Sequence, residues 1–347
     1  MHFPLALQRL SPAAARLCLN VEHFLLRDLH IRHGARFVLA VSGGADSSAL
    51  AVILHILLPR CNFAISAVTV NHKLRPTAAQ EAAQAAALCA RLGIVCVLRE
   101  ADVAAFAARE RIGTEEAGRK LRYAFFEEER KALHADFIAL GHHSKDLTED
   151  VLLRLVRGAG WPALGGMKAR DDARHLLRPL LQEQPDAFRA LLRECDITWQ
   201  EDESNASLCY KRNRLRHTVL PLLRRENPSL DKATASLWQL ARHDSDFWEE
   251  HLKSALAAQP WQADEDSLTL PVELLRALHP AARLRLYHKS IGYTQCRSHA
   301  RAKTLLALDK AWSEGRGNTR FQLPGGIEAR ISRGAVRFCL RKKPVSE

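Results

Sequence analysis

The sequence predicts an α/β fold with a doubly wound parallel sheet, followed by a mostly helical second domain that ends in a small β element. Short apolar runs alternate with helical segments between residues 36 and 157, and such alternation favours a parallel sheet covered on both faces. Helical periodicity then continues over about 219–313, and short β-like pieces follow over 320–341. We expect a boundary near 215–225, which divides the chain into domains 1–218 and 219–347.

Apolar runs predict the strands, and the segments between them carry apolar residues at helical spacing. The expected strands cover 37–41, 63–70, 94–98 and 136–140. The expected helices cover 14–30, 46–58, 76–92, 102–110, 114–134 and 146–157. Residues 158–182 are glycine-rich and irregular, and a short helix is expected over 186–194.

Length, charge and cysteine spacing narrow the class of protein. At 347 residues with 47% hydrophobic side chains, the chain can bury two cores. Its formal net charge of +12 suits a polyanionic partner, most often nucleic acid. No apolar segment approaches the ~18 residues of a membrane-spanning helix, and the N-terminus has no signal-peptide pattern, so we expect a cytoplasmic protein with no membrane partner. Its eight cysteines include no C-x-x-C pair, which excludes the usual zinc and iron–sulfur spacings.

The turn after the first strand carries the clearest chemical signal. Ser42, Gly43 and Gly44 separate the strand from a helix that opens at Asp46 and Ser47. A glycine turn at a helix N-terminus gathers free backbone N–H groups and the positive end of the helix dipole, which together bind phosphate. The spacing fits neither G-x-x-x-x-G-K-[ST] nor G-x-G-x-x-G. A helix cap on a glycine-containing loop is the alternative.

Two further polar clusters follow predicted strands. His72 to Arg75 come after the second strand, and His142 to Glu149 come after the fourth. Because open parallel sheets bind ligands beyond the carboxyl ends of their strands, we expect these clusters to face the glycine turn. His72 and Arg75 could hold a phosphate or a carboxylate, although a solvated loop charge is an alternative for the cation.

Two helices carry charged residues at spacings that place them on one face. Arg119 and Arg122 lie three apart beside Tyr123; a surface helix with glutamate partners is the alternative reading. Asp146, Glu149 and Asp150 stand at i, i+3 and i+4. Carboxylates there would make sense if Mg²⁺ or an amine bridged them to phosphate. For His142 and His143, hydrogen-bonded loop residues are an equally good interpretation.

The densest cationic segment lies at the end of the first predicted domain. RNA backbone contact is our interpretation of this segment, and a solvated charged face is the alternative. Its members are Lys211, Arg212, Arg214, Arg216 and His217.

These clusters, in this order, resemble those of the tRNA(Ile)-lysidine synthetases, members of the PP-loop ATP pyrophosphatase superfamily. SGGADS matches the superfamily's SGGxDS loop, VNHKLRPTAAQEA resembles the family's H-x-LR-x-x-A-x-x-E segment, and EEAGRKLRYAFF resembles its A-R-x-x-RY helix with Gly118 where alanine is usual. LLRLVRGAG, LLRPLL and SN…YKRNRLRHTVLPLL match three further family motifs. The resemblance covers roughly residues 20–225 and implies an adenine nucleotide α-hydrolase-like fold.

The chain departs from the family pattern at one motif. Relatives carry HH-x-DDQ-x-ET after the fourth strand, whereas this chain has His142-His143-Ser144-Lys145-Asp146-Leu147-Thr148-Glu149-Asp150. The second aspartate and the glutamate are kept. Lys145 replaces the first aspartate and so reverses a charge beside the expected site.

The resemblance implies a ligase that forms a carbon–nitrogen bond. ATP would adenylate the wobble cytidine of an isoleucine tRNA with a CAU anticodon, and free lysine would then displace AMP to give lysidine. Residues 1–218 would be the ATP-binding catalytic domain and 219–347 a helical tRNA-binding domain. The oligomeric state stays open, with a homodimer as one option.

The same resemblance implies roles for individual residues. The expected catalytic residues are Asp46, Asp146, Glu149 and Arg119, with Mg²⁺ at Asp46. ATP would contact Ser42, Gly43, Gly44, Ala45, Asp46, Ser47, His72 and Arg75. The tRNA would contact Arg122, Arg157, Lys211, Arg212, Arg214 and Arg216.

Two other functions stay open at this point. One is another PP-loop enzyme, a tRNA thiolase or a glutamine-dependent amidotransferase; the chain has no C-x-x-C pair for the first and starts MHFPL, without the N-terminal cysteine usual in the second. The other is a nucleotide- or RNA-binding homologue that has lost catalysis, which the Lys145 change makes worth testing.

Overall fold

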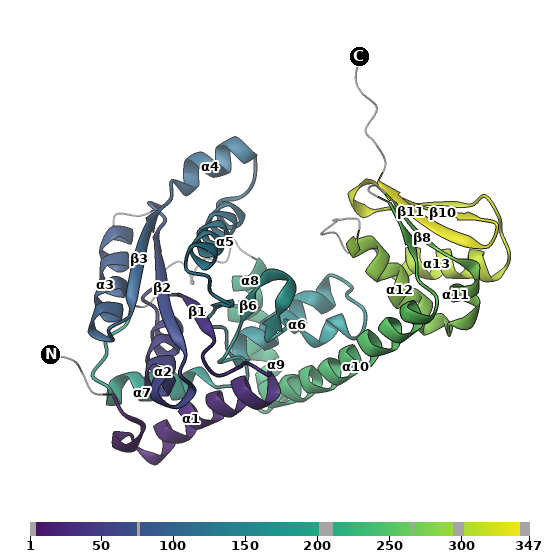
Figure 1. Ribbon diagram of the computed structural model, residues 1–347. Helices are drawn as coiled ribbons and strands as arrows, with labels where there is room; N and C mark the ends of the chain where they lie inside the picture. Colours follow the sequence, from purple (N-terminus) through teal and green to yellow (C-terminus); the bar gives the residue numbers. More distant parts are fainter. Residues whose placement is uncertain (1–4, 75–76, 201–210, 265–266, 294–301, 341–347) are drawn as a thin grey trace. The chain divides into compact units, whose positions relative to one another are not determined.

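The computed structural model describes residues 5–74, 77–200, 211–264, 267–293 and 302–340. The chain forms two compact units (Figure 1). Unit 1 comprises Met1–Leu152 with Gly166–Ala235, and unit 2 comprises Leu153–Gly165 with Ser236–Glu347. The predicted division at residue 218 into a catalytic and a tRNA-binding domain stays a prediction.

Unit 1 is built on a six-stranded sheet with the order β3-β2-β1-β4-β6-β5. Its strands are β1 Arg36–Ala40, β2 Ala64–Asn71, β3 Val95–Glu100, β4 Phe137–Ala139, β5 Arg170–Asp171 and β6 Leu176–Leu177. Neighbouring strands are parallel except for the pair β5–β6 at one edge. In register, Val38 of β1 lies between Ser66 of β2 and Ile138 of β4.

The direction of winding reverses beside β1. From β1 the chain moves outward to β2 and β3, and it then returns to the other side of β1 to form β4. In an open α/β sheet such a reversal opens a crevice at the carboxyl ends of the two strands, where ligands bind. The ends of β1 and β4 therefore define the expected site.

Helices cover both faces of this sheet. Val38, Val68 and Ile138 pack against Phe126 of α5 (Thr114–Ala132) on one face. Because successive side chains of a strand alternate, the buried Phe37 and Leu39 face the opposite side. There α2 (Ala45–Cys61), apolar around most of its circumference and buried along its length, completes the core. The doubly wound α/β fold is confirmed.

Most of the remaining helices of unit 1 agree with the predicted ones to within a few residues, but no helix was predicted over Lys211–Arg214 or Leu215–Val219. The remaining helices are α1 Pro12–His23 with the π turn η2 Phe24–Asp28, α3 Ala78–Arg91, α4 Val103–Glu110, α6 Ser144–Val156, α7 Pro185–Glu194, α8 Lys211–Arg214, the π turn η6 Leu215–Val219 and α9 Leu220–Glu226. The short strands β5 and β6 were both missed, because the sequence suggests irregular structure over 158–182.

Unit 2 combines helices with a five-stranded antiparallel sheet of order β7-β8-β11-β10-β9. The strands are β7 Gln262–Ala263, β8 Ser267–Leu270, β9 Arg320–Leu323, β10 Ile327–Ser332 and β11 Ala335–Leu340. The helices are α10 Leu230–Ala258, which begins in unit 1, α11 Val272–Ala277, α12 Pro280–Tyr293 and α13 Ala302–Ser313. The sequence predicts a break over 259–268 within a helical pattern. In the structure Leu268, in that break, and Leu270, just after it, bury against Phe338 and Leu286, so the β element is larger than expected.

Hydropathy in the structure agrees with the charge-rich sequence. None of the helices in the described part of the chain combines the length and the apolar character that a membrane-spanning segment needs.

A buried ion pair fixes the helices of unit 2. Arg283 donates to Asp309 through Nε at 2.7 Å and through a terminal nitrogen at 3.0 Å, and the Tyr287 hydroxyl donates to the same carboxylate at 3.2 Å.

We predict that Asp309→Ala costs about 3–5 kcal/mol of unfolding free energy, because it leaves a buried guanidinium without its anion. Urea unfolding of the complete chain measures the change in unfolding free energy. Glu314→Ala, on an exposed pair 2.7 Å from Arg316, should cost under ~1 kcal/mol; equal losses would contradict the prediction.

Candidate active site

The loop between β1 and α2 is shaped to receive an anion. Gly43 has a φ of +84°, in the left-handed region where a side chain is strained. The Ser47 hydroxyl accepts the Ser42 N–H at 3.1 Å and donates to the Gly44 carbonyl at 3.1 Å. Gly44 caps α2 without a side-chain hydrogen bond. The first N–H groups of α2 are therefore left to a ligand such as phosphate.

A second segment, far along the chain, is hydrogen-bonded to this loop. The Gln200 N–H donates to the Gly43 carbonyl at 3.0 Å, and its side-chain amide donates to Gln84 of α3. Gln200 therefore fixes the loop from a position 157 residues further along the chain. The sequence gives no signal for this contact.

The end of β4 approaches the N-terminus of α2 closely. A Cβ atom on Gly141 would lie 2.9 Å from the Asp46 carbonyl oxygen and 3.1 Å from the Ser47 nitrogen. Both are backbone atoms and cannot rotate away. Glycine at this position therefore permits the contact that brings the two polar clusters together.

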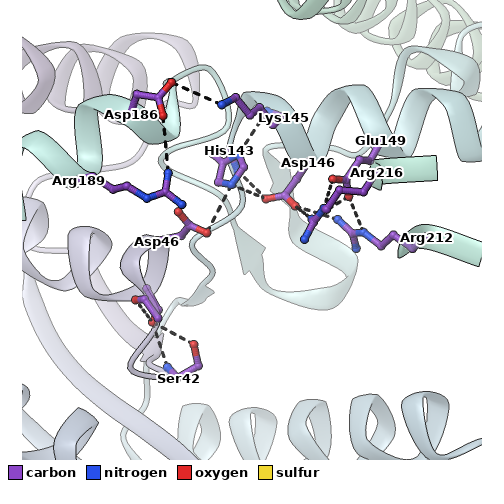
Figure 2. Close-up of polar contacts among 12 residues, drawn as sticks. Ser42, Asp46, His143, Lys145, Asp146, Glu149, Asp186, Arg189, Arg212 and Arg216 are labelled. Atoms are coloured by element: carbon purple, nitrogen blue, oxygen red, sulfur yellow. Dashed lines mark hydrogen bonds and ion pairs between the residues drawn. The ribbon is translucent and has the colours of Figure 1, made fainter. Parts of the chain in front are cut away.

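His143 joins those two clusters (Figure 2). Its Nε2 lies 3.4 Å from Asp46 and 3.4 Å from Asp146, and its Nδ1 accepts the Lys145 N–H at 3.2 Å, so Nε2 carries the proton toward the carboxylates. Burial disfavours its imidazolium, but the hydrogen bond to Asp46 and the charge of Asp146 outweigh burial and raise the pKa of His143. Burial lowers the pKa of His142 to about 3, which keeps that ring neutral.

Beyond His143, two carboxylates of α6 bind two arginines. Arg212 donates to Glu149 at 2.8 Å and to Asp146 at 2.9 Å. Arg216 donates to Asp146 at 3.3 Å and to Glu149 at 2.9 Å. Burial disfavours the Asp146 carboxylate, but the charges of His143 and Arg212 outweigh burial and lower the pKa of Asp146. We call these four residues the charge cluster; Figure 2 shows its guanidinium groups directed at the carboxylates.

Lys145, which departs from the family motif, points elsewhere. Its Nζ lies 3.5 Å from Asp186 in the first turn of α7, and Asp186 in turn lies 3.7 Å from Arg189. A lysine in place of the family's aspartate is thus matched by a carboxylate of its own (Figure 2). The reversed charge at position 145 is therefore balanced by Asp186 in this structure.

The other predicted residues are more scattered, and their roles stay predictions. Arg119 and Arg122 are exposed on α5, where Arg119 stacks 5.4 Å above the Tyr123 ring. His72 is half-buried just after β2, Lys211 and Arg214 are exposed on α8, and Arg157 is exposed in unit 2. Arg75 lies outside the described residues. Arg212 and Arg216, for which tRNA contacts are predicted, bind Asp146 and Glu149 in this structure.

Gly141 and Gln200 shape the site but were missing from the predicted set, and His143 was predicted only as a member of the cluster His142 to Glu149, without a role of its own. His143 and Gly141 both follow β4, and a glycine directly after a strand at a sheet edge was a signal that could have been used. Gln200 carried no such signal.

Asp46 suits a magnesium ion that is held partly by substrate. Its Oδ1 is buried and has no hydrogen-bond partner among the described residues, and no group of three or more potential ligands gathers anywhere in the described part of the chain. Mg²⁺ characteristically uses one or two carboxylates together with water and substrate phosphates. Asp46, a single carboxylate beside an anion-binding loop, fits this coordination preference.

A parallel sheet that reverses beside an Ser-Gly-Gly loop and a helix N-terminus defines a nucleotide-binding α/β protein, and the PP-loop domain model matches residues 17–223. The tRNA(Ile)-lysidine synthase of Nitratidesulfovibrio vulgaris is 46% identical over 316 residues, covering 87% of this chain and 91% of that protein. That of Geobacter sulfurreducens is 35% identical, covering 82% of this chain but 60% of the relative. The chain belongs to the tRNA(Ile)-lysidine synthase family of PP-loop proteins.

A solved structure agrees with the fold. The U34-tRNA thiolase NcsA from Methanococcus maripaludis superposes with a TM-score of 0.54 at 17% identity, over 67% of this chain and 79% of that one. At this identity the likeness concerns the fold alone.

Gly141→Ala should weaken ATP binding by about tenfold or more, because the added methyl group displaces the backbone at the start of α2. Calorimetric titration with ATP measures the loss. Gly113→Ala is a matched control, since its Cβ would meet nothing within 4 Å and its φ is −65°. Unchanged ATP affinity in Gly141→Ala would show that the contact does not shape the loop.

Proposed function

We propose that this chain converts the wobble cytidine of an isoleucine tRNA to lysidine at the expense of ATP. The cytosine carbonyl oxygen attacks the α-phosphorus of ATP, and pyrophosphate leaves. The neutral ε-amine of free lysine then attacks the ring carbon that carries the adenylated oxygen. The bond from that carbon to the oxygen breaks, AMP leaves with the oxygen, and the attacking nitrogen loses a proton.

One observation supports this proposal most directly. The anion-binding loop at the end of β1 and the carboxylates at the start of α6 meet through His143, within 3.4 Å of both Asp46 and Asp146. A phosphate site and an acidic site that share one histidine suit a reaction in which an amine must reach a nucleotide adduct.

For the first step, the residues of the loop act by position and charge. The N–H groups of α2 would receive the ATP phosphates, and Ser42 and Ser47 hold the turn in shape. Asp46 would carry Mg²⁺, which supplies positive charge against the departing pyrophosphate. His143 fixes the other oxygen of Asp46, so the free oxygen stays directed for a ligand.

For the second step, Asp146 and Glu149 supply negative charge next to the loop. Both are buried and bind Arg212 and Arg216, so a lysine ammonium group would bind them in place of a guanidinium group. The exposed cations Lys211 and Arg214, with Arg122 on α5 and Arg157 in unit 2, would contact tRNA phosphates and set its register.

The deciding experiment follows AMP. The chain is incubated with ATP, Mg²⁺ and a CAU-anticodon isoleucine tRNA, with and without lysine. We expect AMP release that depends on both lysine and the tRNA. A chain that releases no AMP in any mixture is a binding protein, and the proposed function is then wrong.

Asp46→Ala tests the role of the loop carboxylate. We expect tRNA-dependent ATP–pyrophosphate exchange to fall by about 10²–10³-fold, the usual cost of removing a preorganised electrostatic contact. Asp172→Ala, which removes an exposed carboxylate of the same unit, should leave the rate near that of the parent. Full exchange in Asp46→Ala would remove this residue from the mechanism.

The Lys145 substitution bears on the alternative of a homologue without catalysis. Since Lys145 binds Asp186 and both side chains are at least one-third exposed, the pair contributes at most ~1 kcal/mol. Lys145→Gln should therefore leave lysine-dependent AMP release within about fivefold of the parent. A much larger loss would show that the ammonium group takes part in the reaction.

A further inference from the structure

In the charge cluster the two carboxylates are buried, and two guanidinium groups balance their negative charge. Asp146 and Glu149 are 8% and 2% exposed, and two guanidinium groups lie against their two carboxylates. Asp146 Oδ1 accepts from both arginines, and each oxygen of Glu149 also has an arginine donor. The acidic groups expected to attract a substrate amine are therefore already bound.

Because the carboxylates are buried, each of them needs a cation beside it. An ionised carboxylate that is taken out of water without a cation is strongly disfavoured. An added ammonium group would in turn leave the cluster with three cations for two anions. A substrate amine can therefore enter at low cost only where a guanidinium group leaves, and the two cations compete for the same oxygens.

The segment that carries the arginines departs from a regular α-helix. Helices α8 and α9 are joined by the π turn Leu215–Val219, in which the Leu220 N–H bonds to the Leu215 carbonyl. Pro221 follows at the start of α9 and has no N–H for the usual bond to His217. Such wide turns are less regular than an α-helix and recur at functional sites. Arg216 lies inside this turn, and the exposed Lys211 and Arg214 lie just before it.

We propose that Arg212 and Arg216 hold the amine site closed until the backbone of the bound tRNA takes their guanidinium groups, so that lysine binds after the tRNA. Phosphate oxygens bind arginine bidentately, as carboxylates do, so the exchange keeps every arginine paired. The freed Asp146 and Glu149 then require a new cation, which the lysine ammonium group supplies. This inference rests on the proposed function and adds an order of substrate binding to it.

Equilibrium dialysis with labelled lysine tests the coupling on the complete chain. We expect lysine to bind at least about fivefold more tightly when the CAU-anticodon isoleucine tRNA is present, and tRNA to bind more tightly in the presence of lysine by the same factor. Equal lysine affinity with and without tRNA overturns the proposal.

Variants separate a closed site from a direct contact between lysine and tRNA. Arg212→Gln leaves two carboxylates with one arginine, so lysine affinity without tRNA should rise by about fivefold or more and the coupling should shrink. Arg212→Lys, which keeps a cation, should restore part of the coupling. Arg225→Gln removes an exposed cation of α9 and is the matched control. If tRNA-free lysine affinity in Arg212→Gln equals that of Arg225→Gln, the proposal is wrong.

The lysine-dependent AMP assay keeps this result distinct from the proposed function. A chain that forms AMP with lysine and tRNA, but binds lysine equally well without tRNA, retains the function and lacks the closed site. Circular dichroism establishes that Arg212→Gln is folded; should it not fold, the comparison of lysine affinity with and without tRNA in the parent chain still decides.

Discussion

The close approach of Gly141 to the first turn of α2 is the contact on which the site depends. With the Gly141 Cβ position 2.9 Å from the Asp46 carbonyl oxygen, the polar residues after β4 come within reach of the loop after β1. A sheet whose winding reverses between these strands creates the crevice, but the absence of a side chain decides how narrow it is. His143 can bridge Asp46 and Asp146 because the two strand ends meet this closely.

Charge balance is the second constraint, and it is satisfied by residues far apart in the chain. Asp146 and Glu149 could not stand buried and ionised by themselves; Arg212 and Arg216, more than 60 positions later, neutralise them. The segment 211–219, which follows β6 and α7 in the chain, thus supplies the positive charges that unit 1 needs beside the carboxylates of α6. The same pairing links the cationic segment to the chemistry of the site.

Local patterns predicted most of unit 1, and the long-range contacts were what the sequence could not supply. Apolar runs located β1, β2, β3 and β4, and the glycine loop was placed correctly because strand, turn and helix are adjacent in the chain. The run of cations around Arg212 predicted an RNA contact, which stays a prediction. Its carboxylate partner Glu149, 63 residues earlier, was not predicted because no local pattern links the two residues. Likewise Leu268 and Leu270 show no strand pattern until Phe338 provides the surface that buries them.

Lys145 illustrates why a changed motif residue must be followed in three dimensions. In the motif alone, a lysine in place of an aspartate reverses a charge beside a nucleotide site. In the structure the ammonium group turns toward Asp186, and the backbone N–H of the same residue still donates to His143. The main chain of Lys145 therefore keeps its contact within the site while its side chain is paired outside it. Because these two parts act separately, the position can change its charge while the orientation of His143, and with it the link between Asp46 and Asp146, is preserved.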